Sequence, residues 1–264
     1  MTITGTTRTY AHIGYPIHHV RTPALYNRLL GERDIDVVVV PVEVAPEDLA
    51  SMAPAFRAWR TLAGIGVTIP HKEAMVHLVD QLTPMAELCG ATNVIRRDSD
   101  GTLVGGQFDG IGLVQSLLQA NHRLKGAKVL MSGAGGTARA VAFALAQAGV
   151  GTLVITNRTR DKAAVIAAQV RQAFPACDAV LHGGEEEFDV VVNTTSLGMK
   201  PGDSLPVDPA VLRPGVVVAD AVMAPPETAL LKLAAERGCT PHPGLLMLQA
   251  QFESTLEFLG LVER

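Results

Sequence analysis

Cysteine is scarce in this chain of 264 residues, and the three that it has are far apart. Cys89, Cys177 and Cys239 are odd in number and show no metal-ligand spacing. This pattern argues against a disulfide framework and against a cysteine-based metal centre. We therefore expect free thiols of a reducing cytosol and no bound metal.

The chain also lacks a large excess of charge of either sign, and it lacks long apolar runs. The formal net charge is −4, which argues against general affinity for nucleic acid. No apolar run is long enough to cross a bilayer, and residues 1–10 are too polar for a signal peptide. We expect a soluble, cytoplasmic protein with neither nucleic-acid nor membrane partners, as a monomer or homodimer.

The chain does have ample material for a core, because 48% of its residues are hydrophobic and only 18% are charged. Strand-like and helix-like segments alternate along it, which predicts a layered α/β fold with parallel strands. Residues 98–101 resemble a turn and predict a hairpin between 91–96 and 102–105. Strands are expected at 9–14, 36–42, 64–69, 129–131, 153–155, 190–192 and 216–219, and helices at 22–30, 46–58, 72–77, 109–121 and 245–259.

The most specific signal is a glycine turn between a strand and a helix. The apolar residues 129–131 run into a Gly-x-Gly-x-x-Ala pattern formed by Gly133, Gly135 and Ala138, and an alanine-rich helical segment follows. The first glycine permits a tight turn, the second permits close approach of a pyrophosphate, and the small alanine lets the helix pack on its strand. The context predicts a dinucleotide site.

The end of the next strand indicates which dinucleotide is bound. An NAD site usually has Asp or Glu about 20 residues beyond the glycines, where it accepts a hydrogen bond from the ribose 2′-hydroxyl. Residues 156–158 include no acid, and Arg158 and Arg160 follow the strand instead. Because guanidinium groups match phosphate geometry, we predict NADP.

Other polar residues also stand at predicted strand ends, where open α/β sheets bind their ligands. Lys72 follows one strand, Asn93 lies at the beginning of another, and Asp109 opens a helix. A lysine that donates a proton, an aspartate that orients it and an asparagine that holds a hydroxyl would serve hydride transfer at a secondary alcohol. Taken singly, each residue also has an ordinary explanation, as a solvated lysine, a turn residue or an N-cap.

An ordered series of motifs resembles the shikimate dehydrogenase family over the whole chain. The series comprises Gly14-Tyr15-Pro16-Ile17-His18-His19, Val67-Thr68-Ile69-Pro70-His71-Lys72, Gly90-Ala91-Thr92-Asn93, Phe108-Asp109-Gly110, Gly133-Ala134-Gly135-Gly136, Asn157-Arg158-Thr159, Asn193-Thr194-Thr195-Ser196-Leu197-Gly198-Met199 and Gly244-Leu245-Leu246-Met247-Leu248-Gln249-Ala250-Gln251.

The resemblance implies two domains with a cleft between them: residues 1–107 plus 242–264 for the substrate, and a Rossmann domain of residues 108–241 for NADP. It also implies NADP-dependent interconversion of 3-dehydroshikimate and shikimate, or of a related cyclic hydroxy acid. Lys72 and Asp109 would be the catalytic pair, and Thr68, Asn93 and Gln251 would contact ring hydroxyls. The residues expected at the cofactor are Gly133, Ala134, Gly135, Gly136, Thr137, Ala138, Asn157, Arg158, Thr159, Arg160, Thr195, Ser196 and Gly244.

Several positions depart from the family pattern, mainly those expected to hold the substrate carboxylate. Thr22 keeps one of two expected hydroxyls, but Val20 replaces the other serine and Met223 replaces a tyrosine. Gly66 also replaces the usual asparagine of an Asn-Val-Thr segment, and Gln107 and Phe108 replace an Asn-Thr pair. We expect an altered or relaxed substrate preference. A quinate-type enzyme using NAD and a non-catalytic NADP sensor remain alternatives.

Five histidines lack the spacing of metal ligands and are interpreted as structural or surface residues: His12, His77, His122, His182 and His242.

Overall fold

The computed structural model describes residues 2–182 and 187–263, and its chain divides into two compact units. The first unit combines Met1–Phe108 with Phe252–Arg264, and the second is Asp109–Gln251. Among the described residues, each unit contains a six-stranded sheet.

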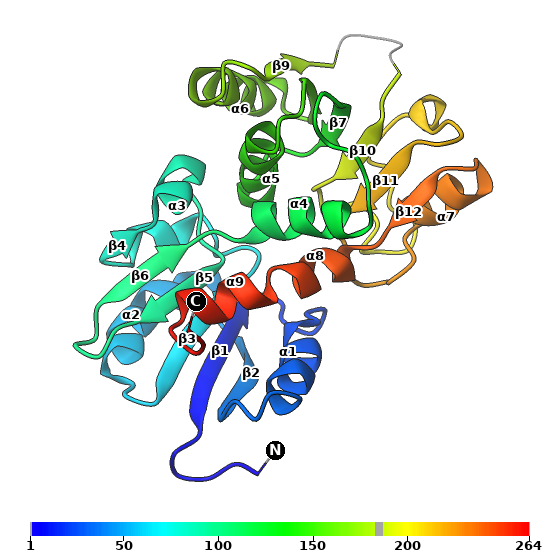
Figure 1. The fold of residues 1–264 in the computed structure, drawn as a ribbon. Coiled ribbons are helices and arrows are strands. Elements are labelled where there is room, and N and C mark those ends of the chain that lie inside the picture. Colours follow the sequence, from blue (N-terminus) through cyan, green and yellow to red (C-terminus); the bar gives the residue numbers. More distant parts are fainter. Residues whose placement is uncertain (1, 183–186, 264) are drawn as a thin grey trace. The chain divides into compact units, whose positions relative to one another are not determined.

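The sheet of the first unit is mixed and has the strand order β2-β1-β3-β5-β6-β4 (Figure 1). Strand β1 pairs in parallel with β2 and β3, whereas β5 runs antiparallel to both β3 and β6, so the predicted hairpin is confirmed. The strands are β1 (Arg8–Gly14), β2 (Val37–Glu43), β3 (Leu62–Val67), β4 (Gln81–Leu82), β5 (Val94–Arg97) and β6 (Leu103–Gly106). The helices are α1 (Thr22–Gly31), α2 (Leu49–Ala58), α3 (Pro84–Cys89) and α9 (Phe252–Phe258), with 3₁₀ turns η1 (Pro46–Asp48) and η2 (Ala74–His77).

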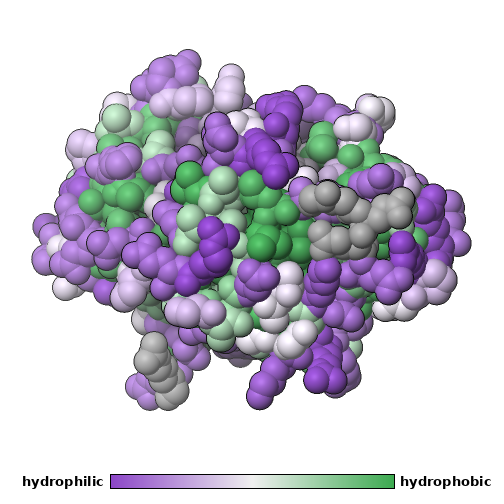
Figure 2. Space-filling model, turned by 90° about the horizontal axis from the view of Figure 1, so that it is seen from above, coloured by the Kyte–Doolittle hydropathy of each residue, from purple (hydrophilic) through white to green (hydrophobic). Residues whose placement is uncertain are grey.

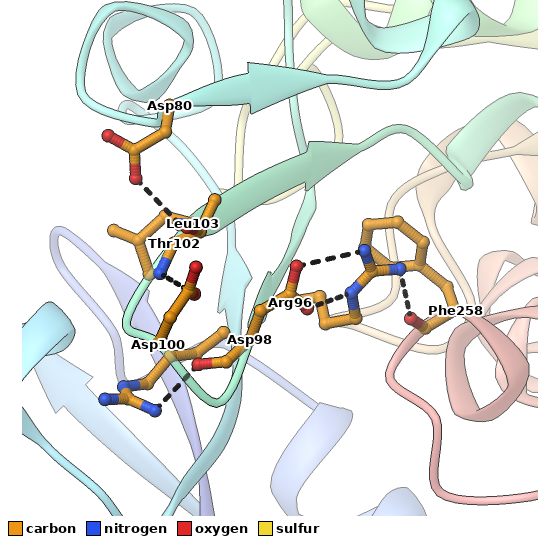
Figure 3. Close-up of polar contacts among 8 residues, drawn as sticks. Asp80, Arg96, Asp98, Asp100, Thr102, Leu103 and Phe258 are labelled. Carbon is orange, nitrogen blue, oxygen red and sulfur yellow. Dashed lines mark hydrogen bonds and ion pairs between the residues drawn. The ribbon is translucent and has the colours of Figure 1, made fainter.

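Polar contacts at the β5–β6 hairpin attach the C-terminal helix α9 to this sheet (Figure 3). Arg96 pairs with Asp98, with 2.6 Å between Nε and Oδ1, and donates a second hydrogen bond to the carbonyl oxygen of Phe258 at 3.3 Å. Its guanidinium also lies 5.1 Å from the centre of the Phe258 ring. The hairpin turn itself is closed by Asp100, which accepts a hydrogen bond from the backbone N–H of Thr102.

The sheet of the second unit is parallel throughout, in the order β12-β11-β10-β7-β8-β9 (Figure 1). This is the doubly wound order of a Rossmann fold. Successive strands are added from β7 toward one edge of the sheet and then from β10 toward the other, so the switch point lies between β7 and β10. The strands are β7 (Lys128–Ser132), β8 (Thr152–Thr156), β9 (Asp178–Leu181), β10 (Val190–Asn193), β11 (Val217–Asp220) and β12 (Thr240–His242). The helices are α4 (Asp109–Gln119), α5 (Gly136–Gln147), α6 (Arg160–Ala173), α7 (Ala229–Glu236) and α8 (Gly244–Ala250), with the 3₁₀ turn η3 (Pro209–Val211).

The C-terminal segment differs from the prediction in two ways. The single helix expected over 245–259 is two helices, α8 and α9, which are separated at Gln251. We also expected residues 242–264 to complete the first unit. Strand β12 pairs with β11 and α8 packs on α4, so residues up to Gln251 lie in the second unit and only 252–264 lie in the first.

Each unit buries an apolar cluster against its sheet. Phe56, Ile65 and Met75 are fully buried in the first unit, and Val191 and Val218 are fully buried in the second. On the face seen in Figure 2, hydrophilic residues lie around and between the apolar ones. Within residues 2–182 and 187–263, none of the helices is both long and apolar enough to cross a membrane.

Helices α4 and α5 of the second unit approach so closely that Gly110 has no room for a side chain. A Cβ atom there would lie 2.1 Å from the carbonyl oxygen of Ala140, which is backbone and cannot turn away. We expect Gly110→Ala to lower the free energy of unfolding by about 2–3 kcal/mol, as other overpacked sites do. Urea unfolding followed by circular dichroism would measure this loss.

The matched control is Gly31→Ala, at the end of α1, where an added Cβ meets nothing within 4 Å. This variant should unfold within about 0.5 kcal/mol of the wild type. Equal stabilities of the two variants would contradict the close approach of α4 and α5.

Candidate functional site

The glycine turn follows β7 at the switch point of the second sheet, where β7 and β10 are neighbours. Ser132, the last residue of β7, is paired in register with Asn193, the last residue of β10. Gly133 follows with φ +123°, and a Cβ atom on it would lie 2.3 Å from Oγ1 of Thr194. Both the backbone conformation and the lack of space therefore require glycine, as the sequence pattern predicted.

Helix α5 begins directly after this turn and presents its N-terminus. Gly135 is the N-cap residue, and a Cβ atom placed on it would meet nothing within 4 Å. The backbone is thus open to a group that approaches the first N–H groups of the helix, where anions are favoured. Ala138 is fully buried, in agreement with its predicted packing role. The turn fits a pyrophosphate.

The adjacent strand β8 ends in a polar, basic loop. Asn157 donates a hydrogen bond from Nδ2 to the carbonyl oxygen of Thr159 at 2.9 Å, which closes the loop. Arg158, Thr159 and Arg160 are exposed, and Arg158 has no hydrogen bond or ion pair to any residue that the structure describes. Its guanidinium is therefore available to an outside anion, which fits a ribose 2′-phosphate.

A buried carboxylate, that of Asp220, lies at the end of β11 and is fully shielded from solvent. Its Oδ1 accepts hydrogen bonds from Nδ2 of Asn193 and from the backbone N–H of Val222, both at 2.9 Å. Its Oδ2 accepts from Oγ1 of Thr228 at 2.7 Å. Burial raises the pKa of Asp220, while the hydrogen bonds from Thr228, Val222 and Asn193 oppose that rise.

Asn193 extends this network into the loop after β10. Its Oδ1 accepts from the backbone N–H of Thr195 at 2.9 Å and from its hydroxyl at 2.7 Å. Its Nδ2 also donates to the carbonyl oxygen of Leu197 at 3.1 Å. The loops after β10 and β11 are therefore held together by side chains, with Ser196 exposed between the bonded residues.

Asn193, Asp220 and Thr228 were not predicted as a group. An acid directly after a buried strand was a signal for Asp220, but nothing in the sequence connected it with Thr228. Gly244, predicted at the cofactor, is buried beside this network, and a Cβ atom on it would lie 2.6 Å from the carbonyl oxygen of Asp220.

In the first unit, backbone hydrogen bonds gather three predicted site residues at one edge of the sheet. Thr68 donates from its N–H to Ile13 at the end of β1, at 2.9 Å. The carbonyl oxygen of Lys72 accepts from Thr92 at 2.9 Å, and that of Asn93 accepts from Val67 at 2.8 Å. Lys72 and Thr68 are half-buried, so their side chains keep contact with solvent.

Asn93 is itself held in place, because its Oδ1 accepts the backbone N–H of Phe108 at 2.8 Å. The remaining two predicted residues of this unit lie near the start of α1: Val20 is half-buried, and Thr22 is buried as the first residue of the helix. The N-cap residue of α1 is Arg21.

The second unit holds the other predicted substrate and catalytic residues. Asp109 opens α4, is only 5% exposed, and accepts a hydrogen bond from Oγ1 of Thr137 at 3.0 Å. Thr137 belongs to the first turn of α5, so the candidate catalytic aspartate is bonded to the helix that follows the glycine turn. Gln251 is buried beside Gly112, and Met223 is half-buried after β11. In the described ranges, no three His, Cys, Asp or Glu residues are grouped as metal ligands.

Comparisons with known proteins show which family this chain resembles. Residues 13–95 match the model of the shikimate dehydrogenase substrate binding domain, and residues 113–198 match that of shikimate / quinate 5-dehydrogenase. A shikimate dehydrogenase (NADP(+)) of Citrifermentans bemidjiense is 39% identical over 96% of this chain and 90% of its own.

Two solved structures have a fold similar to that of this chain. Shikimate 5-dehydrogenase of Listeria monocytogenes, solved with shikimate and NAD, has a TM-score of 0.86 and 33% identity, covering 100% of this chain and 95% of its own. The 5-ketofructose reductase of a Gluconobacter species has a TM-score of 0.83 and 30% identity, covering 96% and 92%. The resemblance found in the sequence is thus confirmed, and this chain belongs to the shikimate dehydrogenase family.

Proposed function

We propose that this protein is an NADP-dependent dehydrogenase that interconverts shikimate and 3-dehydroshikimate. One observation carries the proposal: in a member of this family, a glycine turn opens onto the start of α5 while exposed Arg158 follows β8. Residues 156–158 include no Asp or Glu that could accept a hydrogen bond from a ribose 2′-hydroxyl, as an NAD site would require.

The cofactor would be held mainly by backbone and by arginine. The turn from Gly133 to Gly136 would bind the pyrophosphate, and Arg158 would bind the 2′-phosphate with support from the loop that Asn157 closes. Thr195, which is bonded to Asn193, and the neighbouring Ser196 would border the nicotinamide half. When bound, the nicotinamide ring accepts or returns the hydride of the reaction.

Lys72 and Asp109 would handle the proton that accompanies the hydride. In the reducing direction the ammonium of Lys72 donates a proton to the forming alkoxide, and in the oxidising direction the neutral amine accepts it back. Asp109 would orient the lysine, and its own orientation is supported by the hydrogen bond from Thr137. Asn93, Thr68 and Gln251 would hold ring hydroxyls.

A second candidate substrate class is a neutral polyhydroxy ketone. Val20 and Met223 supply no hydroxyl at two positions where the family pattern has serine and tyrosine. The Gluconobacter structure bears the name of a reductase of 5-ketofructose, which has no carboxylate. These observations favour a relaxed preference, in which shikimate is one of several substrates.

Lys72→Ala tests the proposed chemistry, with wild-type oxidation of shikimate by NADP⁺ as the reference. Loss of a general acid–base group should lower kcat by about 10²–10⁴-fold. The dissociation constant of NADP⁺, measured by calorimetry, should stay within about twofold, because the lysine would act on the substrate alone. Unchanged turnover, or an equal loss of cofactor binding, would contradict this role. An inactive wild type that still binds NADP⁺ would favour the sensor alternative.

Restoring the missing hydroxyls tests the substrate preference. The double variant Val20→Ser/Met223→Tyr should lower the KM for shikimate by about tenfold or more, since a hydrogen bond to a charged group contributes about 1.5–3 kcal/mol. Its activity on a neutral polyhydroxy ketone such as 5-ketofructose should not rise. A wild type that already has a low KM for shikimate, unaffected by the exchange, would refute the relaxed preference.

A further inference from the structure

On one face of the first sheet, a side chain of β1 fills the space beside a glycine of β3. His12 on β1 is paired in register with Gly66 on β3. A Cβ atom on Gly66 would lie 2.2 Å from Nδ1 of His12 and 2.7 Å from Oη of Tyr10. The imidazole therefore occupies the volume that any side chain at position 66 would enter.

The sequence departs from the family pattern at the same place. Position 66 would ordinarily carry an asparagine, whose amide can donate and accept hydrogen bonds. Here the amide is missing, and a residue with an equivalent capacity, His12, fills the space from the neighbouring strand. A side chain that can donate and accept hydrogen bonds is thus present on this face, although it comes from another residue.

His12 also lies next to the edge where Thr68 and Lys72 are gathered. Residues two apart in a strand share a face and are about 7 Å apart, so Gly14 and Thr68 follow His12 and Gly66 on this side. A Cβ atom on Gly14 would meet Cγ2 of Thr68 at 2.5 Å, which confirms that these positions face one another. Since Gly14 has no side chain, His12 is the last side chain of β1 on this face before that edge.

The opposite end of this face is closed by aromatic packing. Tyr10 lies 6.5 Å from His12 and 6.3 Å from Tyr26, measured between ring centres, and Tyr26 packs edge-on against Phe252 at 4.8 Å. Tyr10 is 3% exposed, whereas His12 retains 8%. The imidazole is therefore placed between a packed interior and the predicted substrate residues.

We propose that His12 is a specificity-determining residue, whose imidazole hydrogen-bonds an oxygen of the substrate in place of a side chain at position 66. The inference rests on the proposed function, because it takes Thr68 as a substrate contact. An imidazole donates and accepts one hydrogen bond each when neutral, which suits a hydroxyl or a carboxylate oxygen.

The test compares His12→Leu, which keeps an apolar body of similar size, with His12→Asn, which keeps a hydrogen-bonding group. With shikimate and NADP⁺, His12→Leu should raise the KM for shikimate about tenfold or more, as expected for one lost hydrogen bond, with kcat within about threefold. His12→Asn should stay within about threefold of the wild-type KM. The Kd for NADP⁺ should be unchanged in both, since the cofactor residues belong to the second unit.

Tyr10→Phe is the matched control, because it removes the other polar atom that borders the space at position 66. If the imidazole alone contacts the substrate, the KM of this variant should stay within about twofold of the wild type. The exchange itself is tested by Gly66→Asn, which should be unstable beside His12 and Tyr10. The double variant His12→Val/Gly66→Asn should regain shikimate binding and part of the lost stability, because only Tyr10 then crowds position 66. This pair also serves if His12→Leu folds poorly. The proposal is overturned if KM is unaffected by His12→Leu, or if KM, kcat and Tm change together as in an ordinary packing defect.

Failure of the proposed function would be visible separately, as a wild type that does not oxidise shikimate with NADP⁺. Calorimetric titration of shikimate into the wild type and His12→Leu would then test His12 directly. Weaker binding by the variant supports the proposal, whereas equal affinities, or no binding by the wild type, overturn it.

Discussion

The hydrogen bonds of the buried Asp220 carboxylate are the constraint on which the second unit's site depends. A carboxylate taken out of water is costly unless its oxygens are bonded, and Asp220 meets this need with donors from β10, from its own loop and from the start of α7. Because Asn193 is bonded both to Asp220 and to Thr195, the loops after two adjacent strands form one bonded unit. Side-chain hydrogen bonds therefore hold the candidate cofactor loop to both strands.

At the glycine turn and in the first unit, backbone conformation and main-chain hydrogen bonds position the candidate site residues. The turn at Gly133 is compatible only with glycine, since Thr194 fills the place of a side chain. In the first unit, main-chain hydrogen bonds from Thr68, Thr92 and Val67 bring the segments of Lys72 and Asn93 to one edge of the sheet. Residue identity there is thus left free for chemistry, and Val20 and Gly66 are positions that depart from the family pattern.

Features with local causes could be predicted from the sequence. The glycine turn, the β5–β6 hairpin and the β-branched strands follow from short-range sterics and patterning, and each lies within a few residues of its expected place. The family motifs added the predicted catalytic and substrate-binding roles of Lys72, Asn93 and Asp109. Taken singly, the sequence around each of these residues does not distinguish it from an ordinary surface, turn or cap residue.

Features that depend on distant partners were missed. The break at Gln251 separates a helix that packs on α4 from one that Arg96 holds against the first sheet, and both halves have similar apolar patterns. Strands β9 and β12 are short and gain their stability from neighbours in the sheet. The bond between Asp220 and Thr228 joins residues of different elements, and His12 gains its position from the absence of a side chain at Gly66.

The most direct test of this account is the ratio of kcat/KM for NADP⁺ to that for NAD⁺ in shikimate oxidation by the wild-type protein. If Arg158 binds a 2′-phosphate, NADP⁺ should be preferred by about 10–100-fold, the effect of one charged hydrogen-bonded contact. Turnover with equal use of both cofactors, or a preference for NAD⁺, would contradict the assignment of the loop after β8 and with it the proposed enzyme.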